Sequence, residues 1–200
     1  MTFPLRRLRS SLGVMIALGI TSAVALLASA AQADPIINLS NCNGATLSTP
    51  FAPWADPSSY ELAPGGDFES SAWSLTGHAA VVSGSEPFAA TGTRGDSSLA
   101  LPAGASAQSP PTCVDAAYPT VRFFASGTGT MAVGVVYDGV YVPAGVAVVL
   151  GGWQPSALML TSSALPAAVA GGTTDVSLVF TALTGSLRVD DVFIDPWNRG

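Results

Sequence analysis

The chain has 200 residues, with seven Lys and Arg against 13 Asp and Glu, one histidine and two cysteines. Four arginines, no lysine and all 13 acidic residues follow position 33, so residues 34–200 carry a net charge of about −9. An acidic, lysine-free surface argues against nucleic acid and anionic membrane as partners. The high share of apolar residues excludes a disordered chain.

The first 33 residues have the organisation of a secretory signal peptide. Three arginines within the first nine residues precede the apolar run LGVMIALGITSAVALLASA, and Ala31 and Ala33 supply the small residues of a cleavage site before Asp34. The alternative is an uncleaved N-terminal anchor, since the apolar run is long. The cleavage site favours removal, so we expect a secreted, extracellular protein without a membrane partner after cleavage.

Residues 34–63 are expected to form an irregular N-terminal arm, because this segment is rich in Pro, Ser, Asn and Gly. Trp54 and Tyr60 are predicted to anchor the arm against the domain that follows, residues 64–200. The length after cleavage suits one domain with a hydrophobic core.

The two cysteines, Cys42 and Cys113, lie far apart in the sequence. Because export leads to an oxidising compartment, a disulfide between them is the expected state. It would close a loop of about 70 residues, which corresponds to very roughly 4 kcal/mol in the chain-entropy model. Two free thiols are the alternative. A metal site would need more ligands than two distant cysteines and the single histidine, His78.

Short apolar segments bounded by Gly, Pro, Ser or Asp follow one another from Gly66 onward. Alternation in MAVGVVY and DVSLVFTAL is typical of half-buried strands. The expected strands are 72–82, 97–103, 105–110, 120–126, 130–139, 140–150, 156–162, 174–183 and 186–194. One short helix is a candidate at 163–172. This pattern predicts an all-β fold, a two-sheet β-sandwich of jelly-roll type with about nine strands.

The last predicted strand contains two adjacent carboxylates in the sequence SLRVDDVFIDPW. Alternation predicts that Asp191 shares a face with Leu187, Val189 and Phe193, while Asp190 lies on the other face. A carboxylate inside a sheet needs hydrogen-bond donors or a counter-charge. Alternation alone does not say which of the two faces is inward.

Three motifs occur in a fixed order: PGGDFESSAW (64–73), GDSSLAL (95–101) and SLRVDDVFIDP (186–196), with WQPSALMLTSSA (153–164) before the last of them. In this order they resemble the galactose-binding-like jelly roll of the carbohydrate-binding modules found beside xylanases and cellulases. The resemblance covers roughly residues 64–197. Each motif is weak alone, and together they indicate the fold more specifically than they indicate sugar binding.

The resemblance implies a structural calcium ion between the first and last strands. The matching positions for its ligands are the backbone carbonyls of Asp67 and Ser97 and the side chains of Asp190 and, as a fourth, Glu69. Calcium takes six to eight oxygen ligands, including backbone carbonyls. In the alternative without a metal, Asp190 or Asp191 accepts backbone N–H bonds or pairs with Arg188 or Arg94.

The resemblance also implies aromatic side chains that stack on sugar rings. The candidates are Tyr137, Tyr141, Trp153 and Phe88, with Trp54 from the arm. Tyr137 and Tyr141 lie four residues apart across a turn and form the best pair. The alternative for each side chain is a packing role, and the family position that matches Trp153 is often in the core.

Catalysis is not expected. His78 lies between Gly77 and Ala79 and has no nucleophile signature nearby. Glu61, Glu69 and Glu86 have no distinctive setting as the paired acids of a glycosidase.

Two functions are therefore weighed, with a glycan-active enzyme as a distant third. The first is a secreted, non-catalytic domain that binds an extracellular polysaccharide or wall polymer. The second is a structural or protein-interaction domain of the cell surface, with a surface protein as partner and no sugar site. Exposed aromatics clustered on one sheet face would favour the first. A smooth sheet face of small residues with an apolar patch elsewhere would favour the second.

Overall fold

The computed structural model describes residues 46–70, 72–115, 120–161 and 173–195, all of which belong to one compact unit. They form β-strands and one 3₁₀ turn, η1 (Ala52–Trp54), so the all-β prediction is confirmed. The strands are β1 (Leu47–Ser48), β2 (Tyr60–Leu62), β3 (Ser74–Thr76), β4 (Ala80–Ser83), β5 (Ser97–Pro102), β6 (Ser106–Gln108), β7 (Thr112–Asp115), β8 (Thr120–Tyr137), β9 (Val140–Pro155), β10 (Met159–Leu160) and β11 (Thr173–Asp195).

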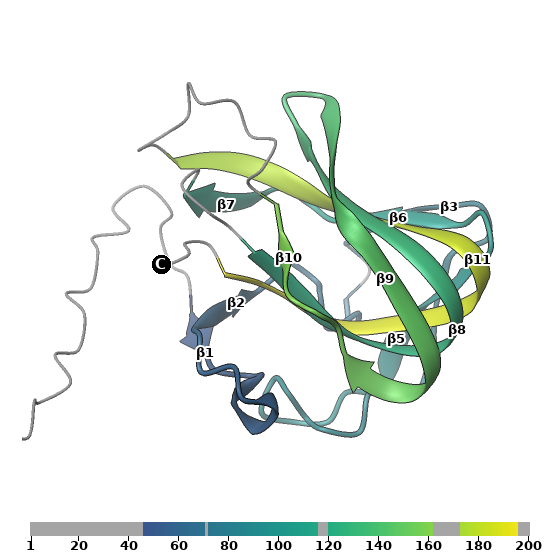
Figure 1. Cartoon of the computed structure of the whole chain (residues 1–200), viewed down its shortest axis with the longest axis horizontal. Coiled ribbons are helices and arrows are strands. Elements are labelled where there is room, and N and C mark those ends of the chain that lie inside the picture. The colour runs from purple at the N-terminus through teal and green to yellow at the C-terminus, as the bar shows by residue number, and fades with distance from the viewer. Residues whose placement is uncertain (1–45, 71, 116–119, 162–172, 196–200) are drawn as a thin grey trace, which may run out of the picture. The chain divides into compact units, whose positions relative to one another are not determined.

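Three long antiparallel strands, β8, β9 and β11, run through both layers of a β-sandwich (Figure 1). In one layer Phe180 of β11 pairs with Val133 of β8, and β6 and β3 continue the sheet on the other side of β11. In the second layer Val189 of β11 pairs with Ala125 of β8, and β5 and β4 continue the sheet. The two layers are therefore joined through continuous strands, as in the predicted jelly-roll type.

Glycines lie where β8 and β11 pass from one layer to the other. Gly127 and Gly129 of β8 and Gly185 of β11 have positive φ angles of 104°, 152° and 77°, which glycine adopts at little cost. A Cβ atom on Gly185 would lie 1.8 Å from the carbonyl oxygen of Thr128. Glycine is thus required here both for the backbone conformation and for the close approach of the two strands.

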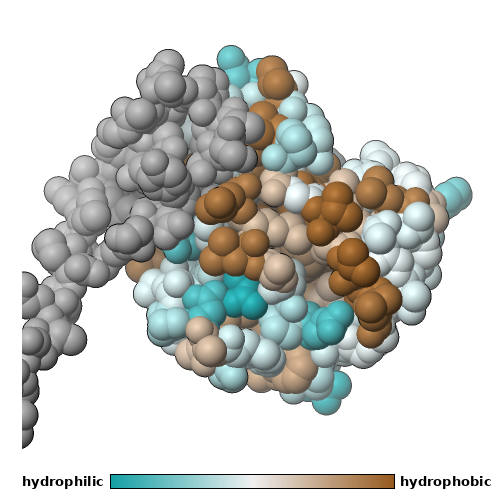
Figure 2. Space-filling model, viewed as in Figure 1, coloured by the Kyte–Doolittle hydropathy of each residue, from teal (hydrophilic) through white to brown (hydrophobic). Residues whose placement is uncertain are grey.

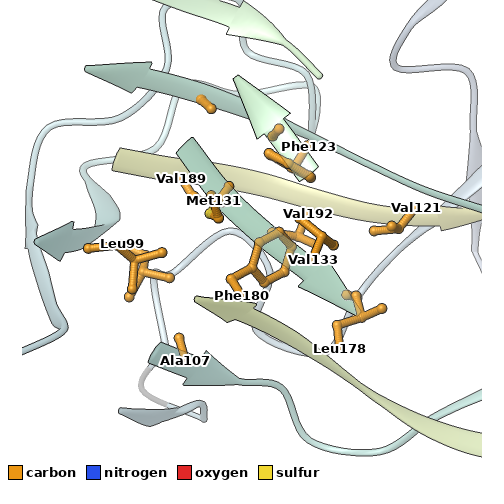
Figure 3. Packing of buried hydrophobic residues seen from close by; sticks show 14 of the residues in the cluster. Leu99, Ala107, Val121, Phe123, Met131, Val133, Leu178, Phe180, Val189 and Val192 are labelled. Carbon is orange, nitrogen blue, oxygen red and sulfur yellow. The ribbon is translucent and has the colours of Figure 1, made fainter. Parts of the chain in front are cut away.

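A hydrophobic core cluster fills the space between the layers (Figure 3). Met131 and Val133 of β8, Phe180 of β11 and Leu99 of β5 belong to it, and none of them has exposed surface. The ring of Phe123 meets that of Phe180 edge to face, with centroids 4.9 Å apart. Within uninterrupted stretches, such as Met131 to Val135 of β8 and Val176 to Ala182 of β11, every second residue belongs to this core, as period-2 alternation predicts.

A second, aromatic cluster joins the N-terminal segment to the other side of the β8–β11 pair. Phe51 and Tyr60 pack against Phe124 of β8 and Phe193 of β11, and all four rings are buried. The guanidinium of Arg122 lies 4.2 Å from the centre of the Phe51 ring. The predicted anchoring of this segment through Tyr60 is therefore present in the structure.

Glycines explain why some predicted strands are longer in the structure. The predicted strands 120–126 and 130–139 are one strand, β8, and 174–183 and 186–194 are one strand, β11. The glycines between them were interpreted as breaks, but they lie at the layer crossings, where pairing continues.

Other differences arise from turns and from long-range pairing. The predicted strand 72–82 is divided into β3 and β4 by a turn at Gly77 and His78, which both have positive φ. Strands β1 and β2 lie in the segment that was expected to be irregular, because β2 pairs with the distant end of β11. The helix candidate at 163–172 lies outside the described residues.

The signal peptide and the Cys42–Cys113 disulfide stay predictions. The signal peptide and Cys42 lie outside the described residues. Cys113 lies on β7 and is not a free thiol, but its pairing with Cys42 stays a prediction. Within the described ranges, no helix combines the length and the apolar character needed to cross a bilayer.

We expect Gly185→Ala to lower the free energy of unfolding by about 3 kcal/mol or more, because the new Cβ meets backbone atoms of Thr128 and Ala disfavours the positive φ. Gly152→Ala is the control: a Cβ there meets nothing within 4 Å, so its effect should stay below about 0.5 kcal/mol. Urea unfolding of both variants measures the difference, and equal stabilities would contradict the role of Gly185.

Candidate functional site

A β-bulge in β11 buries the two adjacent carboxylates. The register of β11 against β8 shifts by one residue between Asp190, which pairs with Phe124, and Phe193, which pairs with Arg122. Asp191 has a φ of 44°. Asp190 is 0% exposed and Asp191 is 4% exposed. Because a bulge interrupts alternation and redirects side chains, two neighbouring residues are both withdrawn from solvent.

The bulge also exchanges the faces of β11. Leu187 and Val189 before the bulge, and Val192 and Ile194 after it, belong to the core cluster between the layers. Phe193 belongs instead to the second, aromatic cluster. The prediction that Phe193 shares a face with Leu187 and Val189 is wrong, because it assumed uninterrupted alternation.

Backbone N–H groups hold the carboxylate of Asp190. The N–H of Glu86 donates to Oδ2 at 2.8 Å, and the N–H of Asp191 donates to Oδ1 at 2.9 Å. These backbone N–H bonds are the ones predicted for the alternative in which no metal is bound. The arrangement does not contain the predicted pair with Arg188, because that side chain donates to the hydroxyl of Ser98 and to the carbonyls of Ser83 and Gly84 at the end of β4.

Glu86 is a third buried carboxylate at this site, and sequence reasoning did not place it here. Its side chain is 0% exposed and accepts hydrogen bonds from the N–H groups of Phe88 and Ala90. Its side chain is also one of the causes that raise the pKa of Asp191. Glu86 is 104 residues from Asp190, so no local pattern connects them. We name Glu86, Asp190 and Asp191 the acidic cluster.

The first motif of the family resemblance lies beside this cluster. The N–H of Val192 donates to the carbonyl of Gly66 at 3.0 Å. The charge of Asp67 is one of the causes that raise the pKa of Asp191. The expected neighbourhood of Asp67 and the DDV strand is therefore present.

The second motif is held at the same place by Glu69. Its Oε1 accepts the N–H groups of Asp96 at 2.7 Å and Ser97 at 2.8 Å. A Cβ on Gly95 would lie 2.5 Å from that oxygen and 3.2 Å from Oγ of Ser85. The structure thus brings together the segments of all four predicted calcium ligands, although Glu69 is engaged in capping a turn.

Burial makes ionisation of the acidic cluster costly. It raises the pKa of Asp190 to about 6, against the opposing hydrogen bonds from Glu86, Ser85 and Asp191. Burial and then the charge of Asp190 raise the pKa of Asp191 to about 8. Among the described residues, no arginine forms an ion pair with the acidic cluster. The ion pair found there, Arg122–Asp56, involves none of its carboxylates.

The acidic cluster has the donor chemistry of a hard cation site. Carboxylate and carbonyl oxygens are the ligands that calcium takes, and a cation would offset the cost of burying like charges. As arranged here, however, no three His, Cys, Asp or Glu side chains among the described residues are grouped to hold a metal ion. The fit is therefore one of donor type only, and Asp190 and Glu86 accept backbone N–H bonds just as Glu69 does.

The predicted sugar platform of Tyr137 and Tyr141 is not formed as a pair. Tyr137 pairs with Val140 and Tyr141 with Val136, so alternation sends the two rings to opposite faces of the hairpin. Tyr137 packs against the core cluster. Tyr141 is 46% exposed and lies across Gly134.

The other aromatic candidates surround the second cluster. Phe88 is 42% exposed and packs edge to face against Trp54, with centroids 5.0 Å apart. Its ring also meets that of Phe124 at 5.4 Å. Trp153 packs against the same cluster, with the guanidinium of Arg188 5.6 Å from its ring. Phe88 and Trp54 are thus the aromatic pair that the structure does bring together.

The glutamates weighed as glycosidase acids have separate settings. Glu61 is half-buried on β2, and burial raises its pKa. Glu69 caps the turn before β5, and Glu86 is buried in the acidic cluster. His78 is exposed in the turn between β3 and β4.

An uncharged outer face lies over one side of the sandwich. We define it as the side chains that point away from the core cluster in residues 128–132 of β8, 146–150 of β9 and 181–186 of β11. These three stretches contain no charged and no aromatic residue. Thr130 and Thr184 satisfy each other through a hydroxyl–hydroxyl hydrogen bond of 2.9 Å. The β8 and β11 parts of this face therefore carry mostly small side chains, and some of their hydroxyl groups are already hydrogen-bonded within the sheet.

Exposed aliphatic side chains form the β9 part of the outer face, and others lie near it around β10. Val146, Val148 and Leu150 are 57%, 61% and 74% exposed. Leu158, just before β10, is 48% exposed, and Leu160, in β10, is 43% exposed. Figure 2 shows hydrophobic side chains gathered in one row over β9 and in a second group over β10.

Two adjoining hollows of about 280 and 440 Å³ lie between these two groups of side chains. Val146, Ala157 and Met159 line both of them. The lining is mostly aliphatic, with Phe123, Gln154 and Ser156 in the smaller hollow. It contains no acidic side chain, so these hollows lack the paired carboxylates of a glycosidase.

No protein-family model matches the chain, and no curated protein matches it. Several solved structures do. One is TmCBM61, a carbohydrate-binding module in complex with β-1,4-galactotriose, at 14% identity and a TM-score of 0.44, over 66% of this chain and 96% of that one.

Two further solved structures are similar to this chain in fold. A family 36 carbohydrate-binding module in complex with calcium and xylotriose has 18% identity and a TM-score of 0.38, over 61% of this chain and 91% of that one. A cyclase from Fischerella sp. TAU has 9% identity and a TM-score of 0.46, over 70% and 99%. The group that the sequence resembles is thus among the structures found, but likenesses at this level identify no ligand or activity.

The acidic cluster predicts how stability depends on pH. Both raised pKa values lie above the ordinary value of 3.8. At pH values between 3.8 and the raised pKa values, the folded protein therefore retains protons that the unfolded chain has released. Stability therefore falls as pH rises through this interval. We expect the free energy of unfolding in metal-free buffer to fall by roughly a few kcal/mol between pH 5 and pH 8.

The variant that checks this dependence is Asp191→Asn, since asparagine accepts the positive φ and cannot ionise. It should flatten the slope, whereas Asp175→Asn, at an exposed position of β11, should keep it. Below pH 4 a different group acts: burial opposes the ionisation of Asp56, but hydrogen bonds from Tyr60 and Arg122 lower its pKa to about 2. Urea unfolding between pH 5 and pH 8 avoids that range, and an unchanged slope in Asp191→Asn would exclude the cluster as the cause.

Proposed function

We propose that the protein is an exported, non-catalytic binding domain that contacts a protein partner at the cell surface through its outer face. Export is supported by the signal-like residues 1–33 and by a lysine-free, acidic composition after them. The single observation that carries the choice of partner is the outer face itself, which is uncharged and combines small side chains with the exposed aliphatic residues Val146, Val148 and Leu150 of β9.

The chemistry of this face suits a protein better than a sugar. Sugar recognition needs exposed aromatic rings beside unpaired polar groups, whereas part of the outer face's polarity is bound within the sheet. The hydroxyls of Ser106 and Thr181 lie 3.0 Å apart, and Ser106 also donates to the carbonyl of Phe180. Aliphatic patches of this kind mark protein interaction sites in soluble proteins.

Binding of an extracellular polysaccharide is the second candidate function, and Phe88 with Trp54 is the observation that favours it. This contact is partly exposed and joins Trp54 of η1 to Phe88 on the loop after β4. Tyr141 offers a second exposed ring on the β8–β9 hairpin. The two locations would act as separate contact points rather than as one platform.

A retention assay separates the two candidates. Protein exported by cells that express the full chain is immobilised and exposed to purified cell-surface proteins and, separately, to a panel of soluble and insoluble polysaccharides. We expect Val148→Asp to lower the capture of a surface protein at least tenfold, because it places a charge on a site that must be desolvated, which corresponds to about 1.4 kcal/mol or more. Phe88→Ala should leave that capture unchanged.

The reverse pattern would support the polysaccharide candidate: retention on one polymer that Phe88→Ala abolishes and Val148→Asp does not. Retention of no polymer and of no protein, the chain itself included, by the wild-type protein would contradict both candidates. Melting temperatures of the variants serve as the control for folding.

We also propose that a structural calcium ion binds at the acidic cluster. The support is the burial of three carboxylates without an arginine partner in the described residues, together with the nearby carbonyls of the first and second motifs. When bound, the ion would supply the counter-charge that the cluster lacks. The side chain of Asp190, with oxygens of Asp67, Glu69 and Ser97 from the first and second motifs, would hold it, and its role would be stability rather than ligand contact.

Calcium in hundredfold excess over its dissociation constant should raise the melting temperature at pH 7.5 by about 5 °C, and a chelator should reverse the gain. Asp190→Asn should remove this response, while Asp175→Asn should retain it. The response should weaken as pH falls below about 6, because protons compete for the carboxylates. A melting temperature that neither calcium nor chelator changes would exclude the ion.

A further inference from the structure

The outer edge of β9 has no partner among the described strands. β9 pairs with β8 along one side only. In an edge strand, every second residue directs its N–H and C=O groups away from the sheet, where another strand can pair with them. Soluble proteins usually protect such edges with charges, prolines or bulges.

The middle of β9 lacks that protection. Residues 145–151 pair with β8 without interruption, and irregularities of register lie at both ends of this stretch. Its sequence is GVAVVLG, which contains no charge and no proline. The prolines of β9, Pro143 and Pro155, lie outside it. Seven residues give an unprotected edge of about 23 Å.

From these observations we infer that two copies of this protein associate through antiparallel pairing of the β9 edges, which joins their sheets across a two-fold axis at Val148. The inference deepens the proposed function, on which it rests, by naming the partner as a second copy. The uncharged stretch is centred on Val148, so a two-fold axis there uses the whole of it and pairs Val146 with the partner's Leu150.

Side-chain chemistry is self-complementary in this register. On the outer face, the exposed stripe Val146, Val148 and Leu150 would meet the same stripe of the partner, giving cross-strand aliphatic pairs. On the other face, Ala147 and Val149 belong to the core cluster, so the two cores would become adjacent. No charge lies on either stripe, so pairing buries no unmatched charge.

The aliphatic hollows support the same face as an interface. They border β9 from Ala144 to Val149, beside the stretch that would pair. An isologous two-fold contact uses the same patch on both copies and closes after two. An edge of this length gives an interface at or below the standard size of stable complexes, so we expect a reversible dimer rather than an obligate one.

Sedimentation equilibrium of the exported protein over a wide concentration range tests the inference. The wild-type protein is expected to dimerise reversibly, and Val148→Asp should weaken the dimer at least tenfold, because two like charges would face each other at the axis. Val81→Asp is the matched control: Val81 is an exposed valine on another edge strand, β4, and its substitution should leave the dimer unchanged. Unchanged melting temperatures exclude misfolding as the cause.

Cross-linking provides a second, independent readout. Val148→Cys should form a disulfide-linked dimer under mild oxidation, because residues at a two-fold axis lie opposite each other. Leu183→Cys, which is 51% exposed on β11, should not form one. A wild-type protein that stays monomeric at every concentration, or a dimer that Val148→Asp leaves intact, would overturn the inference.

The two proposals fail in different ways. A monomeric wild-type protein whose capture of a different surface protein is lost in Val148→Asp would overturn the second copy and leave the outer face as the binding surface. A dimer that Val148→Asp dissociates, without capture of any other protein, would uphold the second copy as the partner.

Discussion

The pairing of β11 with β8 is the constraint on which the rest of the structure depends. These strands stay in register through both layers of the sandwich, apart from two irregularities. The crossing between layers is possible only where backbones approach without side chains, which places Gly127, Gly129 and Gly185 opposite the partner strand's carbonyl groups. The shorter strands β5, β6 and β7 then add to β11, so each layer is built outward from one shared pair.

The irregularity at Asp190 connects this framework to the acidic cluster. An extra residue in β11 allows Val192 to return to the core cluster and Phe193 to reach the aromatic cluster beneath the N-terminal segment. The same extra residue leaves Asp191 buried beside Asp190 and Glu86. Packing on both sides of the strand thus fixes the position of the carboxylates. Their ionisation makes the free energy of unfolding depend on pH between pH 5 and pH 8.

Sequence reasoning predicted what depends on composition, alternation and motif order. Alternation gave the all-β sandwich, and the family resemblance that the motifs carry placed Asp67, Glu69, Ser97 and Asp190 in one region. Sequence reasoning could not place Glu86, which meets Asp190 only through a long-range contact. It also paired Tyr137 with Tyr141 by spacing alone, whereas the register of the hairpin separates their faces.

The distribution of charge gives the unprotected β9 edge its significance. Residues 34–200 carry a net charge of about −9, so two copies repel at long range. At physiological ionic strength this repulsion is screened beyond about 8 Å, while short-range pairing of an uncharged strand is not. Net charge can therefore discourage unspecific association over most of the surface, and the absence of charge between residues 145 and 151 directs association to one edge. A bulged, charged edge would have prevented it at little cost to the fold.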